Sequence, residues 1–551
     1  MQNSATLNAN ARRSIDPILT SLTEEEVYQR EPHLSSKIAF SAPLLVCILL
    51  FTVLLSAPTL LARGSTIAVA WDAEPRTFDP RYAQDANSQY LENLLHCSLI
   101  EYDPQGNKKP SLATHWTWIT PTILEVTVRT DVIFSNKKPV TPQDIAATYG
   151  FFLDPNPKVP SPRKNAFAKL KSVKPVNTDK VIFELMEPDA AFDINLIVGI
   201  LPEDLARQDI MTDPSKISGC GPFTLKSHGN TQIILQPSTH WKLGTPPKFH
   251  ELEIKIVKDE NTRYAKLIAG ELDIVQNLIN RDKIPEIEKK YPQLKVMRRS
   301  GLTTSYLGLN MRDPLLKEPK VRRALAMGID RQKIIKYRLQ GMGQAATTIL
   351  LPSDPFYNKD LVDIPFDPQQ SMNLLDQAGL RDPDGPGPKP RLSLSYKTTT
   401  DLTRILVAKA IAADLKKIGV DVKVESLEWG RFKSDVDQGK VQVWSLTWIG
   451  FKDPDIYRFA FATESFPPHG GNRGWYSRPE LDQALSAGKT EGDPKKRLEH
   501  YRVAQKIIAD DLPYIFLWHE DIFAVVHQRI KNFELYADGR LASATKMEVV
   551  P

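Results

Sequence analysis

Cysteine is the scarcest residue type in this chain, with three among 551 residues. Three cysteines cannot build the dense disulfide framework that holds small secreted domains together. Cys47 lies inside an apolar run, which leaves Cys97 and Cys220 as one candidate disulfide that the sequence alone leaves open. Ordinary hydrophobic cores must therefore stabilise the chain, and its length predicts two to four domains.

The short motifs of common enzyme classes are also missing. The sequence contains no H-E-x-x-H, C-x-x-C, G-x-S-x-G or Walker A pattern. Its ten histidines are scattered and do not show the spacing of a metal site. We therefore expect no catalysis, no cofactor and no metal site.

The chain also lacks a large excess or a dense cluster of charge of one sign. The net charge is +5, and no run dense in Lys and Arg with interleaved aromatic residues occurs. Nucleic-acid-binding domains concentrate positive charge on one surface. The composition therefore argues against a nucleic-acid partner.

One long apolar segment is present near the N-terminus. Residues 38–62 contain no charged side chain and are long enough to cross a bilayer, whereas residues 1–37 are polar and predict disorder. Two interpretations stay open: an uncleaved anchor in the inner membrane, or an export signal with a long n-region. Both place the remaining chain outside the cytoplasm, in the periplasm or cell envelope.

Strand and helix patterns alternate over the rest of the chain, which predicts an α/β fold. The stretch 301–341 organises this pattern. It predicts a strand at Tyr306–Leu309, a helix that begins at Pro319, and a second helix capped by Asp330. Near the C-terminus, YIFLWHEDIFAVVH (514–527) predicts a pair of strands that returns the chain to its first lobe.

Within that organising stretch, YLGLN, VRRALAMGIDR and QGMGQAATTILLP follow one another in order. Together they resemble the signature of the large periplasmic solute-binding proteins of ABC importers, family 5, the peptide- and nickel-binding class. PSLATHW (110–116) and GELDI (270–274) are further shared features, so the resemblance covers nearly everything after residue 64. It implies a two-lobed periplasmic-binding-protein fold of the large, three-subdomain type. The apolar segment 38–62 adds one N-terminal transmembrane or signal helix before this fold.

Composition divides the first 62 residues, and the resemblance divides the chain after residue 64. The predicted parts are a polar tail (1–37), a transmembrane anchor or signal segment (38–62), the first part of subdomain I of lobe 1 (65–98), subdomain II of lobe 1 (99–213), the second part of subdomain I (214–304), lobe 2, or subdomain III (305–514), and a return to lobe 1 (515–551).

For function, the resemblance implies a protein that captures a solute between two lobes and delivers it to the permease and ATPase subunits of an importer. Peptides are the leading ligand class, and nickel chelates, haem and oligosaccharides stay open. A membrane-tethered receptor or chaperone with the same two-lobed body is the alternative function. A hydrolase is a weaker one, because no catalytic motif supports it.

The loop WIGFKDPDIY (448–457) resembles the family's Gly-Trp-x-Gly-Asp-x-x-Asp-Pro loop, which lines the cleft between the lobes. In dipeptide-binding members an aspartate of this loop grips the ligand's amine, and an upstream arginine grips its carboxylate. Here Phe451 stands near the acidic position and Thr398 stands in place of the arginine, so a dipeptide clamp is not expected. The candidate ligand-binding residues are Trp71, Tyr306, Asn310, Thr398, Trp448, Gly450, Phe451, Asp453, Arg473 and Tyr476.

Overall fold

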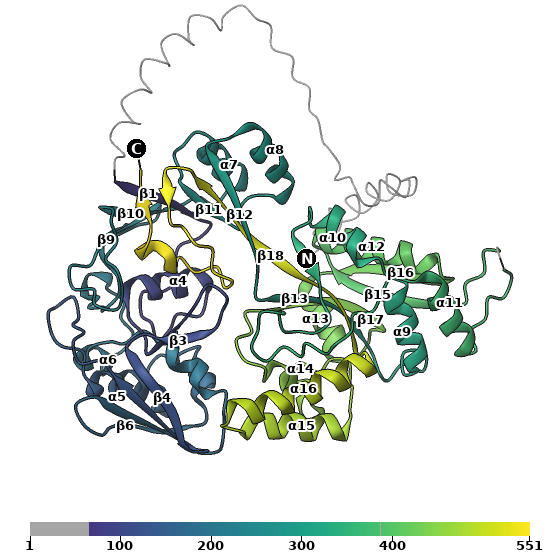
Figure 1. Cartoon of the computed structure of the whole chain (residues 1–551), viewed down its shortest axis with the longest axis horizontal. Coiled ribbons are helices and arrows are strands. Elements are labelled where there is room, and N and C mark those ends of the chain that lie inside the picture. Colours follow the sequence, from purple (N-terminus) through teal and green to yellow (C-terminus); the bar gives the residue numbers. More distant parts are fainter. Residues whose placement is uncertain (1–64, 386, 551) are drawn as a thin grey trace, which may run out of the picture.

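The computed structural model describes residues 65–385 and 387–550. These residues form two α/β lobes joined by extended strands (Figure 1). The predicted tail and the apolar segment 38–62 lie outside the described residues. Within the described part, no helix combines the length and apolar character needed to cross a membrane.

One large sheet runs through both lobes. Its lobe 1 half contains the parallel strands β1 (Thr66–Trp71), β10 (Glu251–Ile256) and β11 (Ile274–Gln276), extended by the antiparallel strands β9 (Gln232–Pro237) and β8 (Phe223–Gly229). Because β1 is covered on both faces, it is almost continuously apolar and buried, from Ile67 to Trp71.

The lobe 2 half is built around three parallel strands: β15 (Leu392–Thr399), β16 (Val420–Leu427) and β17 (Val443–Ile449). The organising strand β13 (Thr303–Leu309) pairs with β17 on one side. The predicted start of the next helix at Pro319 and the cap at Asp330 are confirmed. The helices of this lobe are α9 (Pro319–Met327), α10 (Arg331–Arg338), α11 (Pro368–Gln377), α12 (Leu402–Lys416), α13 (Trp429–Asp437), α14 (Ile456–Phe461), α15 (Pro479–Thr490) and α16 (Pro494–Asp511).

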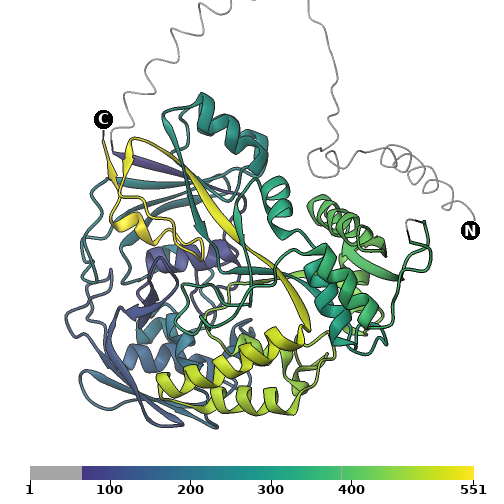
Figure 2. The same ribbon diagram turned by 45° about the vertical axis from the view of Figure 1, so that its right-hand side comes forward.

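The predicted strand pair at 514–527 is wrong, because the structure has one continuous strand there, β18 (Tyr514–His527). Its first half pairs with β13 of lobe 2, and its second half pairs with β11 and β12 (Leu294–Ser300) of lobe 1. The polar residues HED mark the place where the strand passes from one lobe to the other, and sequence alone cannot distinguish such a passage from a turn. Figure 2 shows this strand, in yellow, running between the lobes.

A separate antiparallel sheet completes lobe 1. Its strand order is β4 (Ala113–Thr120), β5 (Ile123–Val128), β7 (Lys180–Leu185) and β6 (Leu170–Pro175). The helix α5 (Pro142–Gly150) belongs to the same part of the chain and buries Tyr149 edge-on against Phe183 of β7, 5.0 Å between ring centroids. The sequence Thr-Pro-Gln-Asp that precedes and opens α5 forms a capping box.

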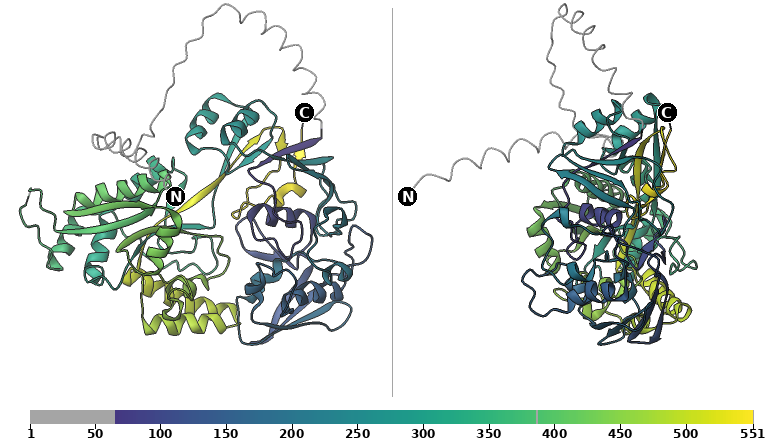
Figure 3. Two further views of the ribbon diagram at one scale, coloured as in Figure 1. Left: turned by 180° about the vertical axis from the view of Figure 1, so that it is seen from behind. Right: turned by 90° about the vertical axis from the view of Figure 1, so that its left-hand side faces the viewer.

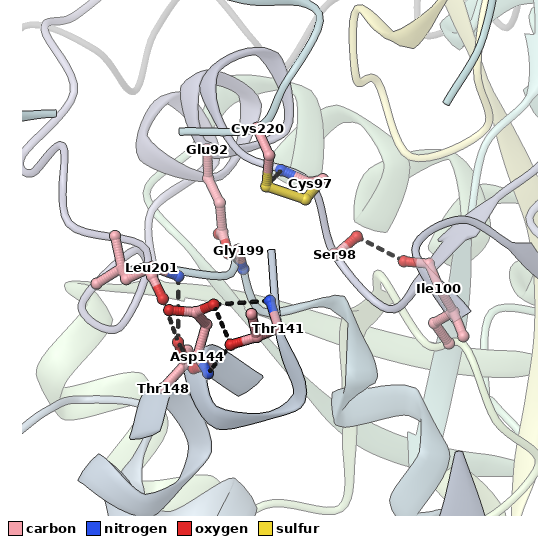
Figure 4. The surroundings of a disulfide bond; sticks show 10 residues. All are labelled: Glu92, Cys97, Ser98, Ile100, Thr141, Asp144, Thr148, Gly199, Leu201 and Cys220. Atoms are coloured by element: carbon pink, nitrogen blue, oxygen red, sulfur yellow. Dashed lines mark hydrogen bonds between the residues drawn. A yellow bond between two sulfur atoms is a disulfide. The ribbon is translucent and has the colours of Figure 1, made fainter. Parts of the chain in front are cut away.

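A disulfide joins Cys97 to Cys220, with 1.97 Å between the sulfurs and 5.1 Å between the Cα atoms. Cys97 follows α4 (Ala86–Leu95), and Cys220 lies in a turn that packs tightly on the end of that helix (Figure 4). The fit requires glycine, because a Cβ on Gly219 would lie 1.9 Å from the carbonyl oxygen of Leu95. The sequence left this pairing open, and the structure forms it.

Gly308 of β13 provides a test of the lobe 2 core. It lies opposite Trp444 of β17, and a Cβ at this position would lie 2.3 Å from the indole ring. We expect Gly308→Ala to lower the free energy of unfolding by about 1–3 kcal/mol, because the buried ring must shift. Urea unfolding followed by fluorescence measures the change.

Gly150, at the end of α5, is the matched control, since nothing lies within 4 Å of a Cβ built there. Gly150→Ala should be neutral or stabilise by about 0.5–1 kcal/mol. Equal effects of the two substitutions would contradict the packing argument.

Candidate functional site

The ends of the parallel strands in lobe 2 mark the first half of the site. In open α/β sheets, ligands bind outside the carboxyl ends of the strands. The segments that follow β15, β16 and β17 begin at this edge, and four exposed large apolar side chains lie in them or, for Ile449, at the end of β17. These side chains are Leu402 (46% exposed), Trp429 (53%), Ile449 (74%) and Phe459 (42%), which we call the apolar edge.

The loop that follows β17 connects this edge with lobe 1 through the side chain of Lys452. The ammonium of Lys452 lies 3.2 Å from the carboxylate of Asp538 and 4.2 Å from the ring centroid of Tyr102. Both partners belong to lobe 1. We call Tyr102, Lys452, Asp538 and Arg540 the lobe junction.

Lobe 1 also presents the carboxyl ends of its parallel strands. Gln276, the last residue of β11, donates a hydrogen bond to the carbonyl oxygen of Gly539 (2.5 Å), and the Tyr90 hydroxyl donates to that of Asp538 (3.2 Å). Trp71, the last residue of β1, packs on Tyr90 with 6.3 Å between ring centroids. The two halves of the large sheet therefore direct corresponding edges toward the same junction.

The lobes also meet at a second place. The backbone N–H of Ala190 in lobe 1 donates to the carbonyl oxygen of Lys489 at the end of α15 (2.9 Å), and Gly492 lies beside Trp118. Figure 3 shows α15 and α16 reaching lobe 1 at the end of the molecule away from α7 and α8. These contacts hold the two lobes together on the side opposite the strands that join them.

Two cations share one carboxylate at the lobe junction. Arg540 donates to Asp538 at 2.7 Å, and Lys452 approaches the same carboxylate. Burial alone would raise the pKa of Asp538, but the two cations outweigh it and hold that pKa well below its usual range. Burial, with Arg540 adding to it, lowers the pKa of Lys452 to about 8.

A carboxylate without an ion-pair partner lies nearby, on lobe 2. Burial raises the pKa of Asp354 to about 6, and Asp453 adds to the shift. The Asp354 carboxylate accepts a hydrogen bond from the Phe356 N–H (2.8 Å) but no salt bridge from any cation of the described residues. The charge of Lys108, in lobe 1, opposes this rise in the pKa of Asp354.

Asp453 was predicted to contact ligand, and the structure uses it differently. Its two oxygens accept hydrogen bonds from both terminal nitrogens of Arg497 on α16, at 2.6 and 2.8 Å, and both side chains are 5% exposed. The pair fixes the loop that carries Lys452. Asp453 therefore positions the loop and does not face the junction as a free carboxylate.

Five other predicted residues lie in the interior, where most of their groups serve packing or internal hydrogen bonds; the Thr398 hydroxyl has no hydrogen-bond partner among the described residues. Tyr306 stacks on Tyr514, 4.0 Å between ring centroids, and the Tyr476 hydroxyl donates to Asp511. A ligand contact from these side chains stays a prediction. They are Tyr306 (1% exposed), Asn310 (6%), Thr398 (0%), Phe451 (8%) and Tyr476 (6%).

The remaining predicted residues stay predictions. Trp448 is partly exposed and stacks on Tyr306 at 5.8 Å, and Arg473 lies over the Trp448 ring at 5.7 Å. Gly450 is exposed, with φ +69°, and its N–H donates to the carbonyl oxygen of Leu302 (2.7 Å). Trp71 is 5% exposed and reaches the junction only through Tyr90.

The lobe junction itself was missed from the sequence. Tyr102, Asp538 and Arg540 belong to no motif, and Tyr102 lies far along the chain from the other two. Lys452 offered the one usable signal, because it is a cation in a loop where the resembling proteins carry an acid.

Comparisons with known proteins agree with this architecture. Residues 107–466 match the family model described as bacterial extracellular solute-binding proteins, family 5 Middle. The oligopeptide-binding protein AppA of Bacillus subtilis (strain 168) is 26% identical over 511 residues, covering 88% of this chain and 91% of that protein. The dipeptide-binding protein of Escherichia coli (strain K12) is 27% identical over 374 residues, 66% of this chain and 69% of that protein.

Solved structures give the same result. The structure of HbpA2 from Haemophilus parasuis superposes with a TM-score of 0.77 at 24% identity, covering 88% of this chain and all of that one (100%). The structure of AppA from Bacillus subtilis in complex with a nonapeptide gives a TM-score of 0.66 at 25% identity, covering 89% and 99%. The two-lobed periplasmic-binding-protein fold is therefore shared along the described chain.

Proposed function

Because this chain belongs to family 5 of the bacterial extracellular solute-binding proteins, we propose that it captures peptides outside the cytoplasm and delivers them to an ABC importer. The observation that carries the proposal is the family match over 107–466 on a body whose two half-sheets direct their carboxyl ends toward one junction. Members of this family are binding components rather than enzymes. Energy for transport would come from a separate ATPase, which acts with a permease.

The proposed binding mode follows from the described groups. A peptide would lie along the apolar edge of lobe 2 and contact the lobe junction, so that it touches both lobes. It would favour the closed form only through its greater affinity for that form. Asp354 would be the carboxylate for the ligand's amine, since it has no salt-bridge partner in the described part.

The segment 38–62 serves export in this proposal. It either remains as an inner-membrane anchor or is removed as a signal. N-terminal sequencing of protein taken from membrane and soluble fractions distinguishes the two states.

The test uses full-length protein purified from its own host in detergent. Native mass spectrometry identifies what co-purifies, and thermal unfolding screens a defined peptide library. A true ligand at a hundredfold excess over its Kd should stabilise the protein by about 2.7 kcal/mol. Small-angle scattering should show compaction with the same peptide.

The mirror-image peptides, built from D-amino acids, are the control and should not stabilise. Stabilisation by haem, a nickel chelate or an oligosaccharide, but by no peptide, would refute the proposed ligand class. Failure of all these solutes would refute capture for transport and favour a receptor or chaperone.

A further inference from the structure

The lobe junction carries more positive charge than its carboxylate can balance, and we propose that Lys452 and Tyr102 form a subsite for a carboxylate group of the ligand. The inference specifies which chemical group of the ligand the proposed binding site recognises. Where the ligand is a peptide, the inference rests on the proposed function of peptide capture. The two residues come from different lobes, so an anion bound here would contact both.

The charge balance is the first argument. The charged groups with the largest effects on the pKa of Lys452 are Arg540, Asp538 and Arg163. Arg163 is already paired with Glu92 at 3.0 Å. This leaves two cations, Lys452 and Arg540, against the single carboxylate of Asp538.

Most of the other carboxylates around the junction already have a cation partner; Asp354 is an exception among the described residues, and no salt bridge joins it to Lys452 or Arg540. Asp193 is paired with Lys108 at 2.6 Å, and Asp453 with Arg497 at 2.6 Å. Glu101 lies 3.5 Å from Lys109. A buried cation without its own counter-ion is costly, and an incoming anion would remove this cost.

Unused hydrogen-bond donors are the second argument. An ammonium has three N–H donors, and Lys452 makes one hydrogen bond within the described part, to Asp538. The hydroxyl of Tyr102 is buried and has no hydrogen-bond partner among the described residues, although the side chain is only 1% exposed. A carboxylate accepts from both kinds of donor, and bonds from a charged donor are the stronger ones.

The same geometry disfavours an amine at this place. Asp538 already lies between two cations, and Lys452 and Arg540 would both repel an ammonium. The lowered pKa of Lys452, about 8, fits a cation that its present surroundings do not fully stabilise. The loop thus presents a positive charge here, whereas the same loop presents an aspartate in the dipeptide-binding proteins that it resembles.

A competing explanation uses the same contacts. Lys452 could act as a latch that holds the lobes together through Asp538 and Tyr102, with no role toward ligand. A latch predicts that removing the lysine expands the ligand-free protein. A carboxylate subsite predicts that removing it changes which ligands bind.

The experiment measures binding of matched acids and amides to full-length Lys452→Met, Lys452→Arg and wild-type protein. The probes are 3-phenylpropionate against 3-phenylpropanamide, and library peptides against their C-terminal amides. Wild type should bind the acids about tenfold tighter, a difference of about 1.4 kcal/mol. Lys452→Met should bring the ratio close to one, and Lys452→Arg should keep it.

Lys440→Met is the matched control, because Lys440 is exposed on the same lobe and should leave the ratio unchanged. Tyr102→Phe should reduce the ratio only partly, since it removes the hydroxyl and keeps the ring. Circular dichroism of each variant verifies folding.

The outcomes distinguish the carboxylate subsite from the latch, and they also distinguish failure of the subsite from failure of the proposed peptide function. A preference for acids that survives Lys452→Met overturns the subsite, as does equal binding of acid and amide to wild type. Expansion of ligand-free Lys452→Met with an unchanged ratio establishes the latch instead. Binding of phenylpropionate but of no peptide supports the subsite and refutes the peptide function, whereas no binding by any acid refutes the subsite.

Discussion

Asp453→Ala is expected to lower the free energy of unfolding of lobe 2 by about 3–5 kcal/mol, because it removes one partner of a buried ion pair. The change leaves the guanidinium of Arg497 buried without its counter-ion, since both side chains are 5% exposed and joined by two hydrogen bonds. Arg497 cannot easily reach water, because it lies against the rings of Phe356 and Tyr501 at 5.3 Å. Urea unfolding followed by tryptophan fluorescence measures the loss.

The same helix provides the control. Arg502 pairs with Glu499 at 3.0 Å on the exposed face of α16. Arg502→Ala should cost less than about 1 kcal/mol, because exposed ion pairs contribute little. If the two substitutions cost the same, the buried pair is not the constraint that holds the loop carrying Lys452.

Loss of the disulfide is expected to have an effect of similar size. Replacing both Cys97 and Cys220 with serine should lower the free energy of unfolding by about 3–5 kcal/mol, because the bond closes a long loop, with a sequence separation of 123 between its ends. Reduction of the native protein should approach the same value once the buried bond is reached, since Cys97 is 3% and Cys220 4% exposed. Thermal unfolding with and without dithiothreitol measures the difference.

Cys47→Ser keeps the bonded pair and serves as the control for thiol chemistry. This variant should unfold like wild type and should remain sensitive to dithiothreitol. A double-serine variant as stable as wild type would show that packing of the Cys220 turn on α4, rather than the covalent bond, holds this part of lobe 1.

In the proposed binding mode, ligand selection depends on a few groups that differ from the pattern of the dipeptide-binding proteins that the loop resembles. The loop after β17 presents Lys452 to the other lobe, and its aspartate is engaged with Arg497. The proposed poles for a peptide are then Asp354 for an amine and Lys452 for a carboxylate. Acid-against-amide pairs are therefore the most informative ligands for this protein.

Much of the fold could be predicted from the sequence because its signals are local. Pro319 and Asp330 set helix starts, as a proline at the first helical position and an aspartate N-cap do. The ordered motifs from YLGLN onward were specific enough to indicate the family, which the comparisons then established. Each of the structural signals lies within a few residues of what it determines.

The site depended on contacts that no local pattern records. Lys452 meets Asp538 across a sequence separation of 86, and Asp453 meets Arg497 across 44. β18 stays one continuous strand while its partners change from β13 to β12 along its length. The residues of β18 alone do not reveal this change of partners.

The sequence by itself therefore determined the α/β class, the family and the places where many elements begin. Only the tertiary structure decided which charges are paired, which are in excess and which aromatic rings are buried. The physical reason is that pairing energy and desolvation depend on distance in space, and chain folding brings together groups whose separation along the sequence carries no information about that distance.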